Sequence, residues 1–216
     1  MNIPPAIFCI GRNYATHAAE MNAPVPDRPT VFMKNPASII SATDTITIPP
    51  ICEEGGPQVD FEGELAVIIG STCRDVSPED ARSCIGGWAA ANDVSARWWQ
   101  KEGSGGQWIR GKSFDGFCPI SEPVRADAIG NPQELTLRTL VNGECMQSAT
   151  TADMIFPVYT LIAELSRGTT LLKGTVILTG TPEGVGAART PPVWLKPGDL
   201  VQVEIEGVGM LANPVA

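Results

Sequence analysis

Residues 59–70, VDFEGELAVIIG, are the stretch that decides the fold. The run is apolar and β-prone apart from its acids, so we expect one continuous strand over these residues. Because side chains alternate along a strand, Asp60, Glu62 and Glu64 are expected on one face and the apolar side chains on the other. Two interpretations are open: a solvent-exposed edge, or a site where a divalent cation offsets the repulsion among three close carboxylates.

A second strand is expected over residues 88–97, WAAANDVSAR, and it carries Asp93. A lone aspartate is commonly a turn former, but an unpaired carboxylate after an apolar run is costly to bury. Placing Asp93 beside Glu62 and Glu64 around one ion removes this cost. Oxygen ligands favour a hard cation, so we expect Mg²⁺ or Mn²⁺, and the set also admits Ca²⁺.

The rest of the chain favours short strands and few helices. Glycine and proline number 22 and 19 among 216 residues, which is typical of a protein with many turns. A helix is expected to begin at Ser77-Pro78 and to end at Gly86-Gly87. A hairpin is expected around Asn142-Gly143, and an amphipathic helix over residues 151–167, capped by Gly168. These elements predict an α+β fold dominated by sheet, in a single domain over residues 1–216.

Composition excludes several classes of function. The chain has 15 basic and 24 acidic residues, a net charge of −9, so neither nucleic acid nor an anionic membrane surface is an expected partner. It lacks an apolar run of the ~20 residues that a membrane span needs, and its start lacks the features of a signal peptide. We therefore expect a soluble, cytoplasmic protein. The six cysteines include no CxxC pair, so we expect buried thiols and no zinc site.

Three further residues are candidates for chemistry. His17, the only histidine, stands three residues before Glu20, and on a helix this spacing lets the carboxylate orient the imidazole. Lys112 lies in the glycine-containing segment IRGKSFDG, and Thr181 lies in the TGTP turn after an apolar run. The alternatives are an incidental histidine, a solvated loop lysine and an ordinary glycine-rich turn.

Several blocks, taken together in order, resemble the fumarylacetoacetate hydrolase superfamily in its short, single-domain, acylpyruvase-like branch. The blocks are CIGRNYATHAAE (9–20), DFEGELAVIIG (60–70), ANDVSAR (91–97), GKSFDGFCPI (111–120), LTGTPEGVG (178–186) and KPGDLVQVEIEGVGMLANPV (196–215). The resemblance implies a mixed, rolled β-sheet or β-sandwich with a few flanking helices, commonly a homodimer.

The resemblance also implies roles for individual residues. It places a metal triad on Glu62, Glu64 and Asp93, and a catalytic His-x-x-Glu pair on His17 and Glu20, in a segment that can act as a lid. Its catalytic loop lysine corresponds to Lys112. The implied substrate-binding residues are Arg12, Tyr14, Gln100 and Thr181. One position departs from the family pattern, because Trp98 stands where relatives often carry an acid, and an indole there is expected to reshape the pocket.

The function that this resemblance implies first is hydrolysis of a C–C bond in a β-diketo acid of the acylpyruvate or fumarylpyruvate type. The products would be pyruvate and a carboxylic acid, and the substrate a small 2-oxo acid bound at Mg²⁺ or Mn²⁺. Three alternatives use the same residues: oxaloacetate decarboxylation, keto–enol tautomerisation, and isomerisation of a hydroxymuconate-type diacid. A non-catalytic metal- or ligand-binding protein is the alternative of a different class.

Overall fold

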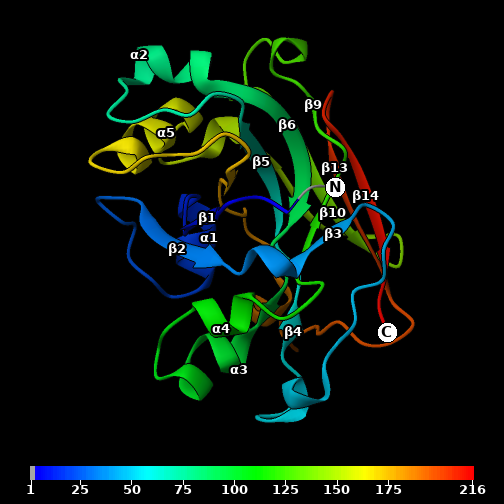
Figure 1. Ribbon diagram of the computed structural model, residues 1–216. Helices are drawn as coiled ribbons and strands as arrows, with labels where there is room; N and C mark the ends of the chain where they lie inside the picture. The colour runs from blue at the N-terminus through cyan, green and yellow to red at the C-terminus, as the bar shows by residue number, and fades with distance from the viewer. Residues whose placement is uncertain (1–2) are drawn as a thin grey trace.

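The computed structural model describes residues 3–216, which form two packed β-sheets with short helices around them (Figure 1). The larger sheet has the strand order β2-β1-β12-β5-β6-β8-β3, with β9 paired to β6, and the smaller sheet has the order β11-β10-β13-β14. β1 pairs in parallel with β12, and β3 with β8, whereas β5 and β6 are antiparallel. The predicted α+β class with a mixed sheet and few helices is confirmed.

The strands of the larger sheet are β1 (Ile7–Gly11), β2 (Thr30–Lys34), β3 (Ile39–Ser41), β5 (Gly63–Ile69), β6 (Ile85–Asn92), β8 (Cys118–Ile120), β9 (Val124–Arg125) and β12 (Val176–Leu178). The smaller sheet contains β10 (Thr136–Val141), β11 (Glu144–Thr150), β13 (Leu200–Ile205) and β14 (Gly209–Pro214), and a separate pair is formed by β4 (Val59–Asp60) and β7 (Ser95–Ala96). The helices are α1 (Ala15–Glu20), α2 (Pro78–Ala81), α3 (Arg97–Gln100), α4 (Ile109–Lys112) and α5 (Val158–Ser166).

The main core lies between the two sheets. Leu65 and Val67 of β5 belong to the same buried cluster as Leu137 of β10 and Val203 of β13. Burial of these apolar side chains is the dominant stabilising contribution to such a sandwich. Figure 1 shows α2 and α5 at one end of the strands, and α3 and α4 at the opposite end, where the chain leaves β7.

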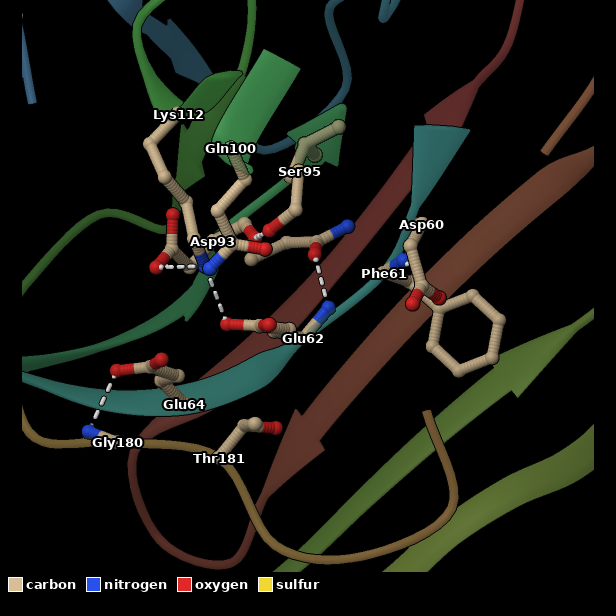
Figure 2. Close-up of polar contacts among 12 residues, drawn as sticks. Asp60, Phe61, Glu62, Glu64, Asp93, Ser95, Gln100, Lys112, Gly180 and Thr181 are labelled. Atoms are coloured by element: carbon tan, nitrogen blue, oxygen red, sulfur yellow. Dashed lines mark hydrogen bonds and ion pairs between the residues drawn. The ribbon is translucent and has the colours of Figure 1, made fainter. Parts of the chain in front are cut away.

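The expectation of one strand over residues 59–70 is wrong. β4 ends at Asp60 and β5 begins at Gly63, and the two strands belong to different sheets. The Asp60 carboxylate explains the break, because it accepts hydrogen bonds from the Phe61 and Gly186 amides at 2.9 and 2.7 Å. Asp60 therefore points away from the other acids of the stretch, as Figure 2 shows.

Three other expected boundaries also differ. Gly86 and Gly87 lie inside β6 rather than at a helix end. A Cβ on Gly86 would lie only 2.7 Å from the Gly70 Cα, so glycine is needed here for the close approach of two backbone segments. The strand expected over 88–97 ends at Asn92, and the helix expected over 151–167 becomes a 3₁₀ turn followed by α5. Pro157 directly precedes α5, and proline is common at the start of a helix.

The turn predictions are confirmed. Asn142 and Gly143 both have positive φ, 53° and 82°, as a two-residue hairpin turn requires, and Gly168 follows α5 with φ of 66°. Of the six cysteines, five are buried and Cys145 is exposed. Within residues 3–216, no helix has the length and apolar character needed to cross a membrane.

Candidate active site

A pocket of about 130 Å³ opens between the end of β1, helix α1 and the α3–α4 segment. Six of the ten residues singled out in the sequence line it: Arg12, His17, Glu62, Gln100, Lys112 and Thr181. These residues come from five segments that lie far apart in the chain. The fold therefore brings most of the predicted site together.

The three predicted metal ligands lie at the base of this site. Glu62, Glu64 and Asp93 are 5%, 1% and 0% exposed, and each offers a carboxylate oxygen within 4.8 Å of the others. Antiparallel pairing of β5 with β6 produces this arrangement, since the Asp93 amide donates to the Glu62 carbonyl at 2.8 Å. Figure 2 shows the three side chains converging on a common space.

Buried cations compensate these carboxylates. Lys112 Nζ lies 2.6 Å from Glu62 Oε2 and 2.7 Å from Asp93 Oδ2. Arg97 Nη1 contacts Glu62 Oε1 at 2.6 Å, and Lys34 Nζ contacts Asp93 Oδ1 at 2.5 Å. Lys34 and Arg97 are therefore members of the site that were not among the residues predicted from the sequence. The signal for Lys34 is its place at the end of the apolar run TVFMK, where a fully buried ammonium needs an acid partner.

The pKa values of Glu62 and Glu64 are shifted in opposite directions. Burial by itself would raise the pKa of Glu62, but Lys112 and Arg97 outweigh burial and hold this pKa well below its ordinary value. The pKa of Glu64 is raised well above its ordinary value, by burial first and then by the charges of Asp93 and Glu62. Burial would lower the pKa of Lys112, yet Asp93 and Glu62 raise it, so Lys112 stays an ammonium.

These residues fit a divalent cation. Three oxygen donors converge, and the pKa of Glu64 is raised by burial first and then by the charges of Asp93 and Glu62, which a bound cation would offset. An all-carboxylate set suits hard ions such as Mg²⁺ and Mn²⁺. Glu62, Glu64 and Asp93 are the residues that would hold the ion.

The TGTP turn closes one side of the cluster. The Gly180 amide donates to Glu64 Oε2 at 2.6 Å, and the Thr181 hydroxyl donates to the Gly63 carbonyl at 3.0 Å. Gly180 has φ of 100°, and a Cβ there would lie 2.7 Å from the Asn13 Cβ. Only glycine allows the turn to approach Glu64 in this way.

His17 and Glu20 form the expected pair on α1. His17 Nδ1 lies 2.7 Å from Glu20 Oε1, and Glu20 Oε2 accepts the Gly184 amide at 2.8 Å. His17 is 6% exposed and lines the pocket. Because the carboxylate engages Nδ1, the Nε2 atom is the nitrogen available to a ligand. A Thr16–Glu183 hydrogen bond also holds this helix to the loop after β12.

Some of the remaining predicted residues line the pocket and others do not. Arg12 lines the pocket with φ of 57°, and its Nε is buried without a hydrogen-bond partner in residues 3–216. Gln100 lines the pocket and accepts from Arg97 Nη1 at 3.0 Å. Tyr14, by contrast, is fully buried in the main core and does not line the pocket. Trp98 packs against Gly55 and Gly103 and is not among the lining residues, so the effect of its indole on the pocket stays a prediction.

The chain is similar to proteins of known family. A family model described as fumarylacetoacetate (FAA) hydrolase C-terminal matches residues 6–216. The chain is 46% identical over 213 residues to "Oxaloacetate tautomerase fahd2, mitochondrial" of Xenopus laevis, covering 98% of this chain and 66% of that protein. The chain thus spans about two thirds of the length of the curated relatives that it matches.

Two solved structures share the fold. A fumarylacetoacetate hydrolase from Exiguobacterium antarcticum is 44% identical with a TM-score of 0.86, covering 99% of this chain and 76% of that one. A 5-carboxymethyl-2-hydroxymuconate delta-isomerase from Mycobacterium smegmatis is 39% identical with a TM-score of 0.85, covering 99% and 79%.

Proposed function

This chain belongs to the fumarylacetoacetate hydrolase family, and from that premise we propose that it interconverts the enol and keto forms of a 2-oxo dicarboxylic acid such as oxaloacetate. The observation that carries the proposal is the pocket itself, in which the oriented imidazole of His17 lies with the Glu62–Lys112 pair of the carboxylate cluster. Such a site can move a proton next to a carbonyl group whose charge is stabilised.

The charge of the pocket favours a substrate with two carboxylates. Arg12, Arg97, Lys101 and Lys112 line it, and Glu62 is the acid among its lining residues. Among the ion pairs of residues 3–216, none involves Arg12 or Lys101. Arg97 and Lys112 are paired with buried carboxylates. Arg12 and Lys101 are therefore the lining cations that can bind the carboxylates of a dianion.

The comparisons support this reaction over the one expected first. Acylpyruvate hydrolysis was the leading interpretation of the sequence, but the similar relatives carry the names oxaloacetate tautomerase and hydroxymuconate-type isomerase. Those names describe enzymes that move protons and double bonds. Hydrolysis of a C–C bond remains the second candidate, because one relative of known structure is named a fumarylacetoacetate hydrolase.

The proposed step needs few groups. From enol to keto, the protonated His17 ring gives a proton to C3, the 2-hydroxyl releases its proton to solvent, and a solvent proton restores the ring. One C–H bond forms, one O–H bond breaks, and no water is consumed. His17 Nε2 exchanges the C3 proton, and Glu20 orients the ring through Nδ1. Lys112 stabilises the oxygen that loses its proton, and Arg12 binds the distal carboxylate, with Gln100 and Thr181 completing the walls. A bound Mg²⁺ or Mn²⁺ would supply Lewis-acid stabilisation of charge at the 2-oxo group.

An ultraviolet assay tests the proposal. Metal-loaded protein is given oxaloacetate, acetylpyruvate and fumarylpyruvate, the enol band is followed, and pyruvate is measured in parallel with an EDTA control. We expect EDTA-sensitive loss of the oxaloacetate enol band without pyruvate. Stoichiometric pyruvate from an acylpyruvate would assign the hydrolase instead, and pyruvate from oxaloacetate would assign a decarboxylase. No metal-dependent change on any substrate would contradict an enzymatic role on this substrate class.

We also propose one catalytic domain over residues 1–216, acting as a homodimer in the cytoplasm. Support for the domain comes from the family match over residues 6–216. The dimer rests on the family resemblance, and light scattering after size-exclusion chromatography tests it. The location rests on composition alone, and localisation of the tagged protein in its own cell is the test.

A further inference from the structure

A β-bulge in the smaller sheet turns a glutamine into the interior beside the metal ligands. β10 and β11 shift register between Thr139 and Leu140, so that Thr139 pairs with Gln147 and Leu140 with Cys145. The extra residue, Met146, breaks the alternation, and both Met146 and Gln147 are buried, at 7% and 1% exposure. Bulges commonly re-aim a side chain in this way next to a functional site.

Both polar atoms of the buried Gln147 side-chain amide form hydrogen bonds. Its Oε1 accepts the Gly63 amide at 3.0 Å, and its Nε2 donates to the Thr181 hydroxyl and the Pro182 carbonyl, both at 2.8 Å. Thr181 in turn donates to the Gly63 carbonyl at 3.0 Å. Gln147 and Thr181 therefore bind both the N–H and the C=O of Gly63, which stands between Glu62 and Glu64 in the chain.

The same bulge also supports the loop that follows the TGTP turn. Arg189 Nη2 donates to the Met146 carbonyl at 2.7 Å, and its Nε donates to the Gly184 carbonyl at 3.3 Å. Gly184 is the residue whose amide holds Glu20. The β-bulge at Met146 and Gln147 thus contacts three segments: the one that carries Glu62 and Glu64, the one that carries Thr181, and the loop at Gly184 that binds Glu20.

We propose that Gln147 is a positioning residue, which sets the spacing of the Glu62 and Glu64 carboxylates through the Gly63 backbone and orients Thr181 toward the substrate pocket. Without Gln147, the Gly63 amide loses its acceptor and the segment between the two ligands can rotate. Removing a residue that supports a metal ligand through hydrogen bonds commonly lowers metal affinity by about 10–100-fold. This inference rests on the metal site of the proposed function, but not on which reaction that site performs.

The test compares two glutamines that undergo the same change. In Gln147→Met the side chain keeps its length and loses its hydrogen bonds. Gln133→Met is the matched control, because Gln133 also bridges backbone groups of two segments, Thr151 and Val158, at 2.7 and 2.8 Å, and does not line the pocket. Metal-free protein is titrated with Mn²⁺ by calorimetry, and folding is checked by circular dichroism and by thermal unfolding in EDTA.

We expect Mn²⁺ affinity to fall about tenfold in Gln147→Met and to change less than about twofold in Gln133→Met. Equal affinities in Gln147→Met and wild type would overturn the proposal, and so would equal losses in the two variants. Absence of Mn²⁺ binding to the wild-type protein would instead contradict the metal site of the proposed function. The two failures are therefore distinguishable.

A second variant keeps the proposal testable if Gln147→Met does not fold. Gln147→Glu retains an acceptor for the Gly63 amide but cannot supply both donors to Thr181 and Pro182. We expect Mn²⁺ affinity within about threefold of wild type and about tenfold weaker binding of oxalate to the Mn²⁺-loaded protein. Oxalate is the probe because it presents the same pair of oxygens as a 2-oxo carboxylate. Wild-type oxalate binding in this variant would overturn the role assigned to Thr181 orientation.

Discussion

The carboxylate cluster and helix α1 face the same pocket, but they are held in very different ways. Glu64 lies in β5, Glu62 directly precedes β5 and Asp93 directly follows its partner strand β6, and all three are almost fully buried. α1 is six residues long, has no side-chain cap at its start, and contacts the loop at Gly184 through Glu20. The Glu20 side chain that makes this contact is 19% exposed.

If the proposed function holds, this difference predicts that binding of the cation and transfer of the proton are separable. The cluster is held by backbone pairing of β5 with β6 and by the buried hydrogen bond from the Gly63 amide to Gln147. The α1 pair depends on a few side-chain hydrogen bonds to one loop, so it can move or be disabled without disturbing the sheet. Variants in the two regions should therefore fail in different ways.

Removing a ligand from the cluster is expected to have the largest effect. Glu64→Gln keeps the shape and the Gly180 contact but removes a negative oxygen, so metal affinity should fall by more than about 100-fold, with loss of turnover. Calorimetry with Mn²⁺ measures the affinity. Glu204→Gln, on strand β13 and outside the pocket, is the control and should bind as wild type does. Wild-type affinity in Glu64→Gln would remove Glu64 from the ligand set.

Changing the imidazole should affect the reaction without affecting the ion. His17→Gln is expected to lower turnover by about 10²–10⁴-fold, because the group that exchanges the C3 proton is gone. Its Mn²⁺ affinity should stay within about twofold of wild type, since His17 is not part of the carboxylate set. Steady-state rates and calorimetry on the same preparation check both halves. A fully active His17→Gln enzyme would refute the assigned role.

Weakening the orientation of the imidazole should have an intermediate effect. Glu20→Gln removes the carboxylate that holds Nδ1 and weakens the bond to Gly184, so turnover should fall by about 10–100-fold with metal affinity unchanged. The matched control is Glu164→Gln, which changes another helical i,i+3 pair, with Arg167, on the surface. Equal activities of the two variants would show that Glu20 does not act through His17.

The smallest expected effect is the change of metal affinity with pH, which depends on the carboxylate cluster and not on α1. The pKa of Glu64 is raised by burial and by Asp93 and Glu62, so in the metal-free protein this carboxyl holds its proton to higher pH than usual. A cation must displace that proton, so metal affinity should rise with pH, by at most about tenfold per unit, and level off above the pKa of Glu64. Titrations at several pH values measure the slope. His17→Gln should show the same slope, and a flat profile in both proteins would contradict the displacement.

Much of the site follows from short-range patterns. The spacing of Glu62 and Glu64 and the i,i+3 spacing of His17 and Glu20 depend only on the geometry of one strand and one helix turn. The Asn142-Gly143 turn is equally local. Together with the ordered blocks of the family resemblance, such patterns were sufficient to identify the family and six of the pocket residues.

The interpretation of Asp60 shows where local patterns stop. Alternation placed Asp60 beside Glu62, but the chain changes sheets between them, and Asp60 instead binds Arg97 at 2.7 Å. The alternation of residue types along the chain does not predict this change of sheet, because the change depends on hydrogen bonds from the amides of residues 186 and 187 in a distant loop.

The sequence by itself therefore determined the family, the α+β class and the acids and histidine that we propose carry the chemistry, since these depend on residue types and on separations of a few residues. Only the tertiary structure decided what surrounds them. Lys34 reaches Asp93 across 59 residues of chain, and Gln147 reaches Gly63 across 84. Such contacts depend on which strands pair and in which register, and on where a bulge falls, and these are settled by packing of the whole chain.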